Sequence, residues 1–235
     1  MKKTVLITGA SRGIGFAIAK SLQPEFENMI LVAKHKDTLD KAALQLKSTK
    51  IYKYVVDLED EKEVLKFAKE INKKFKSLDV LVNNAGVYIG KRFDKQPLSE
   101  IIKMLNLNLR AHLILTHELL NLLKKGENSQ IVNISSCAVS VNFYGEAVYS
   151  ATKSAISSFS NVLRKELNSE GIRITAIEPF GVDTYPTPQP DYLLNPMEIG
   201  EVVKYVIKRP PFVQIDVVEL SHIKQWRGTK PDWIE

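Results

Sequence analysis

The chain has 235 residues, of which 44% are hydrophobic and 26% are charged, proportions that exclude a disordered chain or a coiled coil. Its length fits one large α/β domain or two small ones, and because no internal boundary is evident we expect residues 1–235 to form a single domain. Lys and Arg number 33 against 27 Asp and Glu, but the basic residues are dispersed, so we expect no nucleic-acid partner.

Short runs of β-branched and aliphatic residues alternate with longer amphipathic segments along the chain. The runs predict strands at residues 4–8, 29–33, 51–56, 80–83, 130–134, 173–177 and 213–217. The amphipathic segments predict helices at residues 13–22, 36–46, 62–75, 99–123, 149–168 and 196–208. Such alternation produces parallel βαβ units, and strands that are almost wholly apolar indicate a sheet covered on both faces. We therefore expect a doubly wound (Rossmann) α/β fold, with a parallel sheet of about seven strands and helices on both faces.

The first predicted strand runs into a glycine-rich turn, Thr8-Gly9-Ala10-Ser11-Arg12-Gly13-Ile14-Gly15, that precedes the first helix. Gly9 permits a tight turn, Gly13 lets the backbone approach a pyrophosphate, and Gly15 allows the helix to pack closely on the sheet. The free N–H groups and the dipole of the helix would then face the phosphates. This pattern predicts a dinucleotide site; a turn without a ligand is the alternative.

The residues that follow the second predicted strand indicate which dinucleotide is bound. NAD-preferring enzymes of this architecture place an acidic residue there, whereas this strand ends in Lys34-His35-Lys36 and Asp37 comes three residues too late. Lys34 and Arg12 would attract the 2′-phosphate of NADP(H), which predicts NADP(H) as the cofactor. The alternative is that both are solvated surface cations.

Five motifs in order over residues 1 to about 184 resemble those of the short-chain dehydrogenase/reductase family. They are the T-G-x-x-x-G-x-G turn, Asp57-Leu58, Asn83-Asn84-Ala85-Gly86, Asn108, and Ser136 followed by Tyr149-x-x-x-Lys153. The resemblance implies that Asp57 contacts adenine, Lys153 binds the nicotinamide ribose, Ser136 binds the substrate oxygen, and Asn108 holds a water in a proton relay. Ser136 is preferred to Ser135 because of its thirteen-residue spacing from Tyr149.

Tyr149 and Lys153 are four residues apart, so they share one face of the predicted helix. We expect the ammonium of Lys153 to lower the pKa of Tyr149 and so to make it a general acid/base. The catalytic residues expected are Asn108, Ser136, Tyr149 and Lys153. The cofactor-binding residues expected are Gly9, Ser11, Arg12, Gly13, Ile14, Gly15, Lys34, Asp57, Leu58, Asn84, Ala85, Gly86, Tyr149, Lys153, Val182 and Thr184.

One departure from the family pattern follows the sixth predicted strand. Pro179-Phe180-Gly181 replaces the usual Pro-Gly, next to Val182 and Thr184. Residues 183–196 then form a proline-rich loop at the edge where such sheets bind ligands, which predicts a loop that covers the substrate; a rigid surface loop is the alternative. Its composition does not identify the substrate, and Trp226 and Trp233 near the end of the chain have no assigned role.

The motifs predict an NADP(H)-dependent oxidoreductase that transfers hydride between nicotinamide and a carbonyl compound or secondary alcohol. A non-catalytic NADP(H)-sensing regulator of the same fold is the alternative. The segment 99–123 is apolar on more of its surface than one sheet contact requires, which with the family resemblance predicts a homodimer or homotetramer.

Cysteine usage and the apolar runs bear on location and on metals. Cys137 is the single cysteine and no run of 18 apolar residues occurs, so we expect a cytoplasmic chain with no membrane partner. The four histidines fall in unrelated segments, for which solvated or capping roles are expected, so no metal site is predicted.

Overall fold

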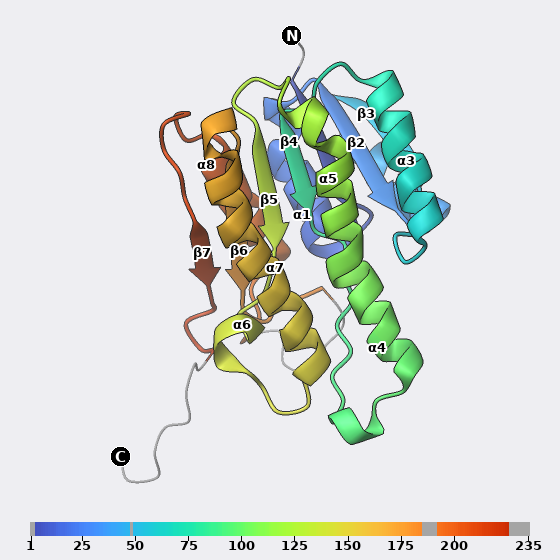
Figure 1. Ribbon diagram of the computed structural model, residues 1–235, viewed down its shortest axis with the longest axis vertical. Coiled ribbons are helices and arrows are strands. Elements are labelled where there is room, and N and C mark those ends of the chain that lie inside the picture. Colours follow the sequence, from blue (N-terminus) through green and yellow to red (C-terminus); the bar gives the residue numbers. More distant parts are fainter. Residues whose placement is uncertain (1–2, 48, 185–191, 226–235) are drawn as a thin grey trace.

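The computed structural model describes residues 3–47, 49–184 and 192–225, which contain a seven-stranded sheet (Figure 1). The strand order is β3-β2-β1-β4-β5-β6-β7, and every neighbouring pair is parallel. From β1 the chain winds outward to β3, and from β4 it winds outward in the opposite direction to β7. The expected doubly wound α/β fold is confirmed, and the carboxyl ends of β1 and β4 lie side by side at its switch point.

The strands are β1 (Thr4–Thr8), β2 (Asn28–Ala33), β3 (Lys50–Val55), β4 (Val80–Asn83), β5 (Gln130–Ile134), β6 (Arg173–Pro179) and β7 (Val217–Leu220). Every residue of β1, β4, β5 and β6 is buried, as the apolar runs predict for strands covered on both faces. The edge strands β3 and β7 are partly exposed.

The prediction of a last strand at residues 213–217 is wrong by four residues, because β7 begins only at Val217. The preceding segment reaches β6 through side chains instead of a backbone ladder. Gln214 Nε2 donates to the Ile174 carbonyl at 2.8 Å, and Thr175 Oγ1 donates to the Ile215 carbonyl at 2.7 Å. These side-chain bonds take the place of strand pairing over residues 213–215, and backbone pairing starts at Asp216, whose carbonyl accepts from the Ala176 N–H at 3.0 Å.

The helices form two layers. They are α1 (Gly13–Leu22), α2 (Lys36–Leu44), α3 (Glu61–Lys74), α4 (Leu98–Leu105), α5 (Ala111–Leu123), α6 (Ala138–Val141), α7 (Ala147–Leu167) and α8 (Pro196–Ile207). Figure 1 shows α3, α5 and α7 on the face of the sheet towards the viewer, and their apolar residues share one core cluster. Helices α1, α2 and α8 contribute to the cluster on the opposite face. Among the described residues, no helix is both long enough and apolar enough to cross a membrane.

The single helix predicted over residues 99–123 is interrupted by a π-helical segment, Asn106–Arg110, between α4 and α5. Asn108, in the middle of this segment, is fully buried and bonds to both backbone groups of Val87. A π-helical turn inserts one residue into a helix, and such turns often occur at functional sites. The interruption here occurs where the helix meets the loop that follows β4.

Helix α7 is fixed to the sheet by buried hydrogen bonds as well as by apolar packing. Asn133 on β5 donates to Ser160 Oγ at 2.8 Å and accepts from Asn83 Nδ2 at 2.9 Å. Nearer the start of α7, the Lys153 carbonyl accepts from Ser135 Oγ at 3.0 Å, and Ser157 Oγ lies 2.9 Å from the same hydroxyl. These bonds set the position of α7 along β5.

Replacing Asn133 should therefore weaken the fold measurably. Asn133→Ala leaves the buried Ser160 hydroxyl and Asn83 amide without this partner, and we expect a loss of about 2 kcal/mol in the free energy of unfolding. Urea unfolding followed by circular dichroism measures it. Asn161→Ala, at an exposed position of α7, is the control and should change stability by less than about 0.5 kcal/mol. Equal stabilities for the two variants would contradict the role of Asn133 in fixing α7 to the sheet.

Candidate active site

The glycine turn between β1 and α1 has the geometry of an anion cradle. Gly13 has a φ of +55°, a conformation that favours glycine. A Cβ at Gly15 would lie 2.3 Å from the Gly9 carbonyl oxygen and 2.4 Å from Asn84 Nδ2, so no larger residue fits there. The N-cap residue of α1, Arg12, makes no side-chain capping bond, and the first turn of α1 holds no acidic residue. The residues present therefore fit a dinucleotide pyrophosphate at this helix N-terminus.

The segment after β4 is fixed against this turn by Thr8, which opens the glycine motif but has no cofactor or catalytic role among the residues expected from the sequence. Thr8 Oγ1 accepts hydrogen bonds from the backbone N–H groups of Asn84 at 2.9 Å and Ala85 at 3.0 Å. Asn84 Nδ2 returns a bond to the Thr8 carbonyl at 2.8 Å. These bonds hold the expected cofactor residues of the two loops next to each other.

Asn108 and His112, one turn apart on the helix, bond to the backbone of the segment after β4. Asn108 accepts from the Val87 N–H at 2.8 Å and donates to the Val87 carbonyl at 2.9 Å. His112 Nε2 lies 2.7 Å from the Ala85 carbonyl. Complete burial and the nearby charge of Lys153 lower the pKa of His112 to about 3, so the ring is neutral and its Nε2–H donates.

The expected solvated or capping role is thus wrong for His112, which is fully buried. Its contact joins residues 27 positions apart in the sequence, and no local pattern indicates it. Within the part of the chain that the structure describes, no three His, Cys, Asp or Glu side chains gather in a way that could hold a metal ion.

Tyr149 lies on the first turns of α7, with Lys153 one turn further along. Ser136, after β5, hydrogen-bonds to Tyr149, whereas Ser135 points away and bonds to the Lys153 carbonyl and Ser157. Lys153 Nζ donates to the Ile134 carbonyl at 2.8 Å and lies 5.8 Å from the centre of the Tyr149 ring. A Cβ at Gly86 would lie 3.7 Å from Lys153 Nζ, so the segment after β4 passes directly beside this lysine.

The expectation that Lys153 lowers the pKa of Tyr149 is wrong for this structure. Burial raises the pKa of Tyr149 to about 12; the Ser136 hydrogen bond opposes this rise, and the Glu146 charge adds to it. The ammonium of Lys153 is directed to the Ile134 carbonyl, and its own burial lowers its pKa to about 8. Tyr149 is therefore protonated at neutral pH.

Lys34, directly after β2, lies between two carboxylates. Its Nζ is 2.8 Å from Asp57 Oδ2 and 3.1 Å from Glu59 Oε1. The hydrogen bonds to Asp57 and Glu59 raise the pKa of Lys34. Burial acts to raise the pKa of Asp57, but the bonds from Lys34 and the Glu59 backbone outweigh it and hold this pKa below its usual range. The adjacent Leu58 is buried.

The segment after β6 reaches the glycine turn. Thr184 is so placed that a Cβ at Gly13 would lie 3.0 Å from its methyl carbon, and Val182 forms an isolated parallel bridge with Leu194. Thr184 thus lies at the N-terminus of α1, whereas Val182 packs against the core cluster to which α1 contributes. Residues 185–191 of the expected substrate loop, and both tryptophans, lie outside the described residues.

Two residues that the motifs do not include contact the expected catalytic tyrosine or its neighbours. The Tyr88 ring meets the Tyr149 ring edge-on, with centroids 5.1 Å apart and an interplanar angle of 86°. The Tyr88 hydroxyl donates to Glu146 Oε1 at 2.8 Å. Only the fold brings Tyr88 to Glu146, across 58 positions of sequence.

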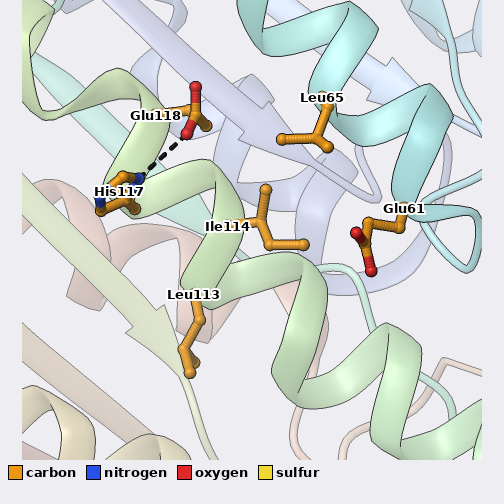
Figure 2. A pocket seen from close by; sticks show the side chains of 6 residues that line it. All are labelled: Glu61, Leu65, Leu113, Ile114, His117 and Glu118. Atoms are coloured by element: carbon orange, nitrogen blue, oxygen red, sulfur yellow. Dashed lines mark hydrogen bonds and ion pairs between the residues drawn. The ribbon is translucent and has the colours of Figure 1, made fainter.

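Figure 2 shows a surface hollow between α3 and α5 that is separate from this arrangement. None of the expected catalytic or cofactor residues lines it. Its lining residues are Glu61, Leu65, Leu113, Ile114, His117 and Glu118.

Comparisons with known proteins agree with the architecture. A sequence model of the short chain dehydrogenase family matches residues 3–189. An uncharacterized oxidoreductase of Staphylococcus aureus (strain N315) is 29% identical over 225 residues, which cover 94% of this chain and 97% of that protein. The structure of an alcohol dehydrogenase from the archaeon Thermococcus sibiricus, complexed with 5-hydroxy-NADP, superposes with a TM-score of 0.88 at 28% identity, covering 95% of this chain and 98% of the other. A serine dehydrogenase from Escherichia coli superposes with a TM-score of 0.83 at 26% identity, covering 95% and 99%.

Proposed function

The chain belongs to the short-chain dehydrogenase family, and from this premise we propose that it is an NADP(H)-dependent oxidoreductase acting on a carbonyl compound or secondary alcohol. One observation carries the proposal. Tyr149, hydrogen-bonded to Ser136 and one helical turn from Lys153, lies beside a loop that Thr8 fixes to the glycine turn. A proton donor and a dinucleotide cradle thus lie at one edge of the sheet.

Each residue of the site would have a separate role in the reduction. The bound nicotinamide supplies the hydride. Tyr149, whose pKa lies near 12, holds its proton at neutral pH and would give it to the carbonyl oxygen of the substrate. Ser136 bonds to Tyr149 and would orient the same oxygen. Lys153 would bind the nicotinamide ribose, and Asn108 and His112 hold the loop against which the ring would lie.

A preference for NADP(H) over NAD(H) is supported by the charges near the end of β2. The position that would hold an acidic residue in an NAD-preferring enzyme is Lys34, and Arg12 lies exposed in the glycine turn. Asp57 and Glu59 both form ion pairs with the ammonium of Lys34, so a 2′-phosphate would have to compete with these two carboxylates for Lys34. The Thermococcus relative was solved with an NADP derivative, which agrees with this preference.

The proposal is tested by fluorescence titration with NADPH, followed by a measurement of NADPH oxidation over a panel of aldehydes and ketones. We expect binding and turnover of at least one carbonyl compound. Binding without turnover of any member would favour the alternative, a non-catalytic NADP(H)-sensing protein. The same assay with both cofactors also measures the preference.

We further propose that the chain forms a homodimer or homotetramer through α4 and α7, which contact each other. Apolar side chains on both helices face solvent in the isolated chain: Leu98, Ile102, Leu105 and Val162. Exposed apolar surface of this kind marks a protein interface.

The single, buried Cys137 also agrees with a cytoplasmic location, because the chain can form no internal disulfide.

If α4 and α7 form the interface, one charge introduced there should dissociate the oligomer. Val162→Glu should shift the particle to a smaller species in light scattering at micromolar concentration, because a carboxylate would be buried at the interface. Val55→Glu is the matched control: both valines are 52% exposed, but Val55 lies on the remote edge strand β3, and the variant should keep the parental mass. A monomeric parent protein would contradict the proposal.

A further inference from the structure

Tyr88 and Glu146 form one side of the space in front of Tyr149. Besides the edge-on ring contact and the hydroxyl–carboxylate bond, a backbone bond fixes their two loops to each other. The Lys91 N–H donates to the Gly145 carbonyl at 2.7 Å. Glu146 immediately precedes α7, so its carboxylate has a fixed position relative to Tyr149 three residues later.

Among the described residues, no cation forms an ion pair with the carboxylate of Glu146. Its bonding partner, the Tyr88 hydroxyl, is neutral, and burial together with the Glu146 bond raises the pKa of Tyr88 to about 12. The nearby cations are already engaged: Lys91 Nζ lies 3.0 Å from Glu100, and Arg92 Nε lies 2.7 Å from Asp94.

The titratable and charged groups that face Tyr149 are few. Lys153 comes from the same helix as Tyr149, Glu146 from the position just before that helix, Tyr88 from the loop after β4, and Cys137 from the loop after β5. Lys153 is buried, and its Nζ donates to the Ile134 carbonyl. Among these described groups, Glu146 supplies the only carboxylate, and its charge acts on Tyr149.

Two further aromatic residues of the described chain lie on loops that are hydrogen-bonded to Glu146 and Cys137 or to their neighbours. Phe143, after α6, and Phe180, after β6, meet edge-on with centroids 6.2 Å apart. The Phe143 carbonyl accepts from the Glu146 N–H, and Cys137 N–H donates to the Pro179 carbonyl next to Phe180. Tyr88 and Phe143 keep 55% and 40% of their surface exposed, so both rings are available to a substrate. Aromatic faces of this kind favour apolar and ring-bearing ligands.

We propose that Tyr88 and Glu146 are specificity-determining residues that select uncharged, apolar or aromatic carbonyl compounds and disfavour substrates that carry a carboxylate. This inference rests on the proposed oxidoreductase function and names the substrate class of the same site. An apolar group would pack against Tyr88 and Phe143. A carboxylate on the substrate would instead approach the carboxylate of Glu146 in a partly water-excluded space.

Two aldehydes of similar size and shape test the proposal: 4-methylbenzaldehyde, which is uncharged, and 4-carboxybenzaldehyde, which is anionic. We expect the parent enzyme with NADPH to show a kcat/KM about tenfold higher for the uncharged compound. Glu146→Gln should reduce this ratio about fivefold, because the amide keeps the hydrogen bond from Tyr88 but removes the charge. Asp94→Asn removes a carboxylate that Arg92 already offsets, and it should leave the ratio unchanged.

The outcomes separate this inference from the function on which it rests. Equal kcat/KM values for the two aldehydes, or a ratio that Glu146→Gln leaves unchanged, would overturn the specificity role while the oxidoreductase function stands. Reduction of charged aliphatic carbonyl compounds but of neither aromatic aldehyde would overturn it as well. Failure to reduce any carbonyl compound, with NADPH bound, would contradict the proposed function itself.

Discussion

Tyr149→Phe should lower kcat for carbonyl reduction by about 10²–10⁴-fold, the usual contribution of a general acid. The substitution removes the hydroxyl that holds the proton at neutral pH but keeps the ring. The ring maintains the edge contact with Tyr88 and the position of Lys153 Nζ 5.8 Å from its centre. The dissociation constant for NADPH, from fluorescence titration, should therefore stay close to that of the parent.

A second tyrosine provides the control for this experiment. Tyr205→Phe, at an exposed position on α8, removes a hydroxyl far from Ser136 and Lys153 and should leave kcat unchanged. Turnover near the parental value in Tyr149→Phe would show that another group donates the proton. A matching loss of NADPH affinity would show that the hydroxyl contributes to cofactor binding rather than to proton transfer.

Combining Lys34→Asp with Arg12→Ala should move the cofactor preference towards NADH by about 30-fold or more in kcat/KM. Two partly screened contacts to a 2′-phosphate, at roughly 1 kcal/mol each, correspond to a preference of that size. The new carboxylate would also repel the phosphate and could accept hydrogen bonds from the ribose hydroxyls of NADH. Initial rates with each cofactor at saturating carbonyl substrate measure the shift.

The two carboxylates beside Lys34 require a separate control. Asp at position 34 would lie next to Asp57 and Glu59, which now contact Lys34, and their mutual repulsion should lower the melting temperature. Lys34→Ala with Arg12→Ala removes both cations without adding a third acid, and it should lose the NADPH preference without gaining affinity for NADH. Equal use of NADPH and NADH by the parent would contradict the role of Lys34.

The strands could be predicted from the sequence because their burial on both faces requires continuous apolar runs, and β1 and β4 begin and end at the predicted residues. The last strand could not. Gln214 connects to Ile174 through its side chain, and an apolar run cannot distinguish such a contact from a backbone ladder.

The interruption between α4 and α5 depends on a contact outside the helix. The π-helical segment coincides with the bonds from Asn108 to Val87, 21 positions away, whereas the hydrophobic pattern over residues 99–123 is that of one helix. A spacing rule that considers only neighbours along the helix cannot register such a partner.

The candidate site shows the same division between local and long-range information. The four-residue spacing from Tyr149 to Lys153 predicts a shared helix face, and the glycine spacing predicts the turn. The pKa of Tyr149 could not be predicted in this way, because it depends on burial and on the Ile134 carbonyl, to which Lys153 donates. Likewise, His112 and Tyr88 enter the site only through contacts that the fold creates.

The central claim, hydride transfer to a carbonyl carbon, is tested most directly by the fate of a label. NADPH carrying deuterium at one or the other prochiral position of nicotinamide C4 is incubated with the enzyme and its best carbonyl substrate, and the alcohol is analysed by mass spectrometry. A cofactor held in one orientation should deliver one deuterium to the former carbonyl carbon from one labelled form and none from the other. An alcohol without deuterium from either form would contradict the account.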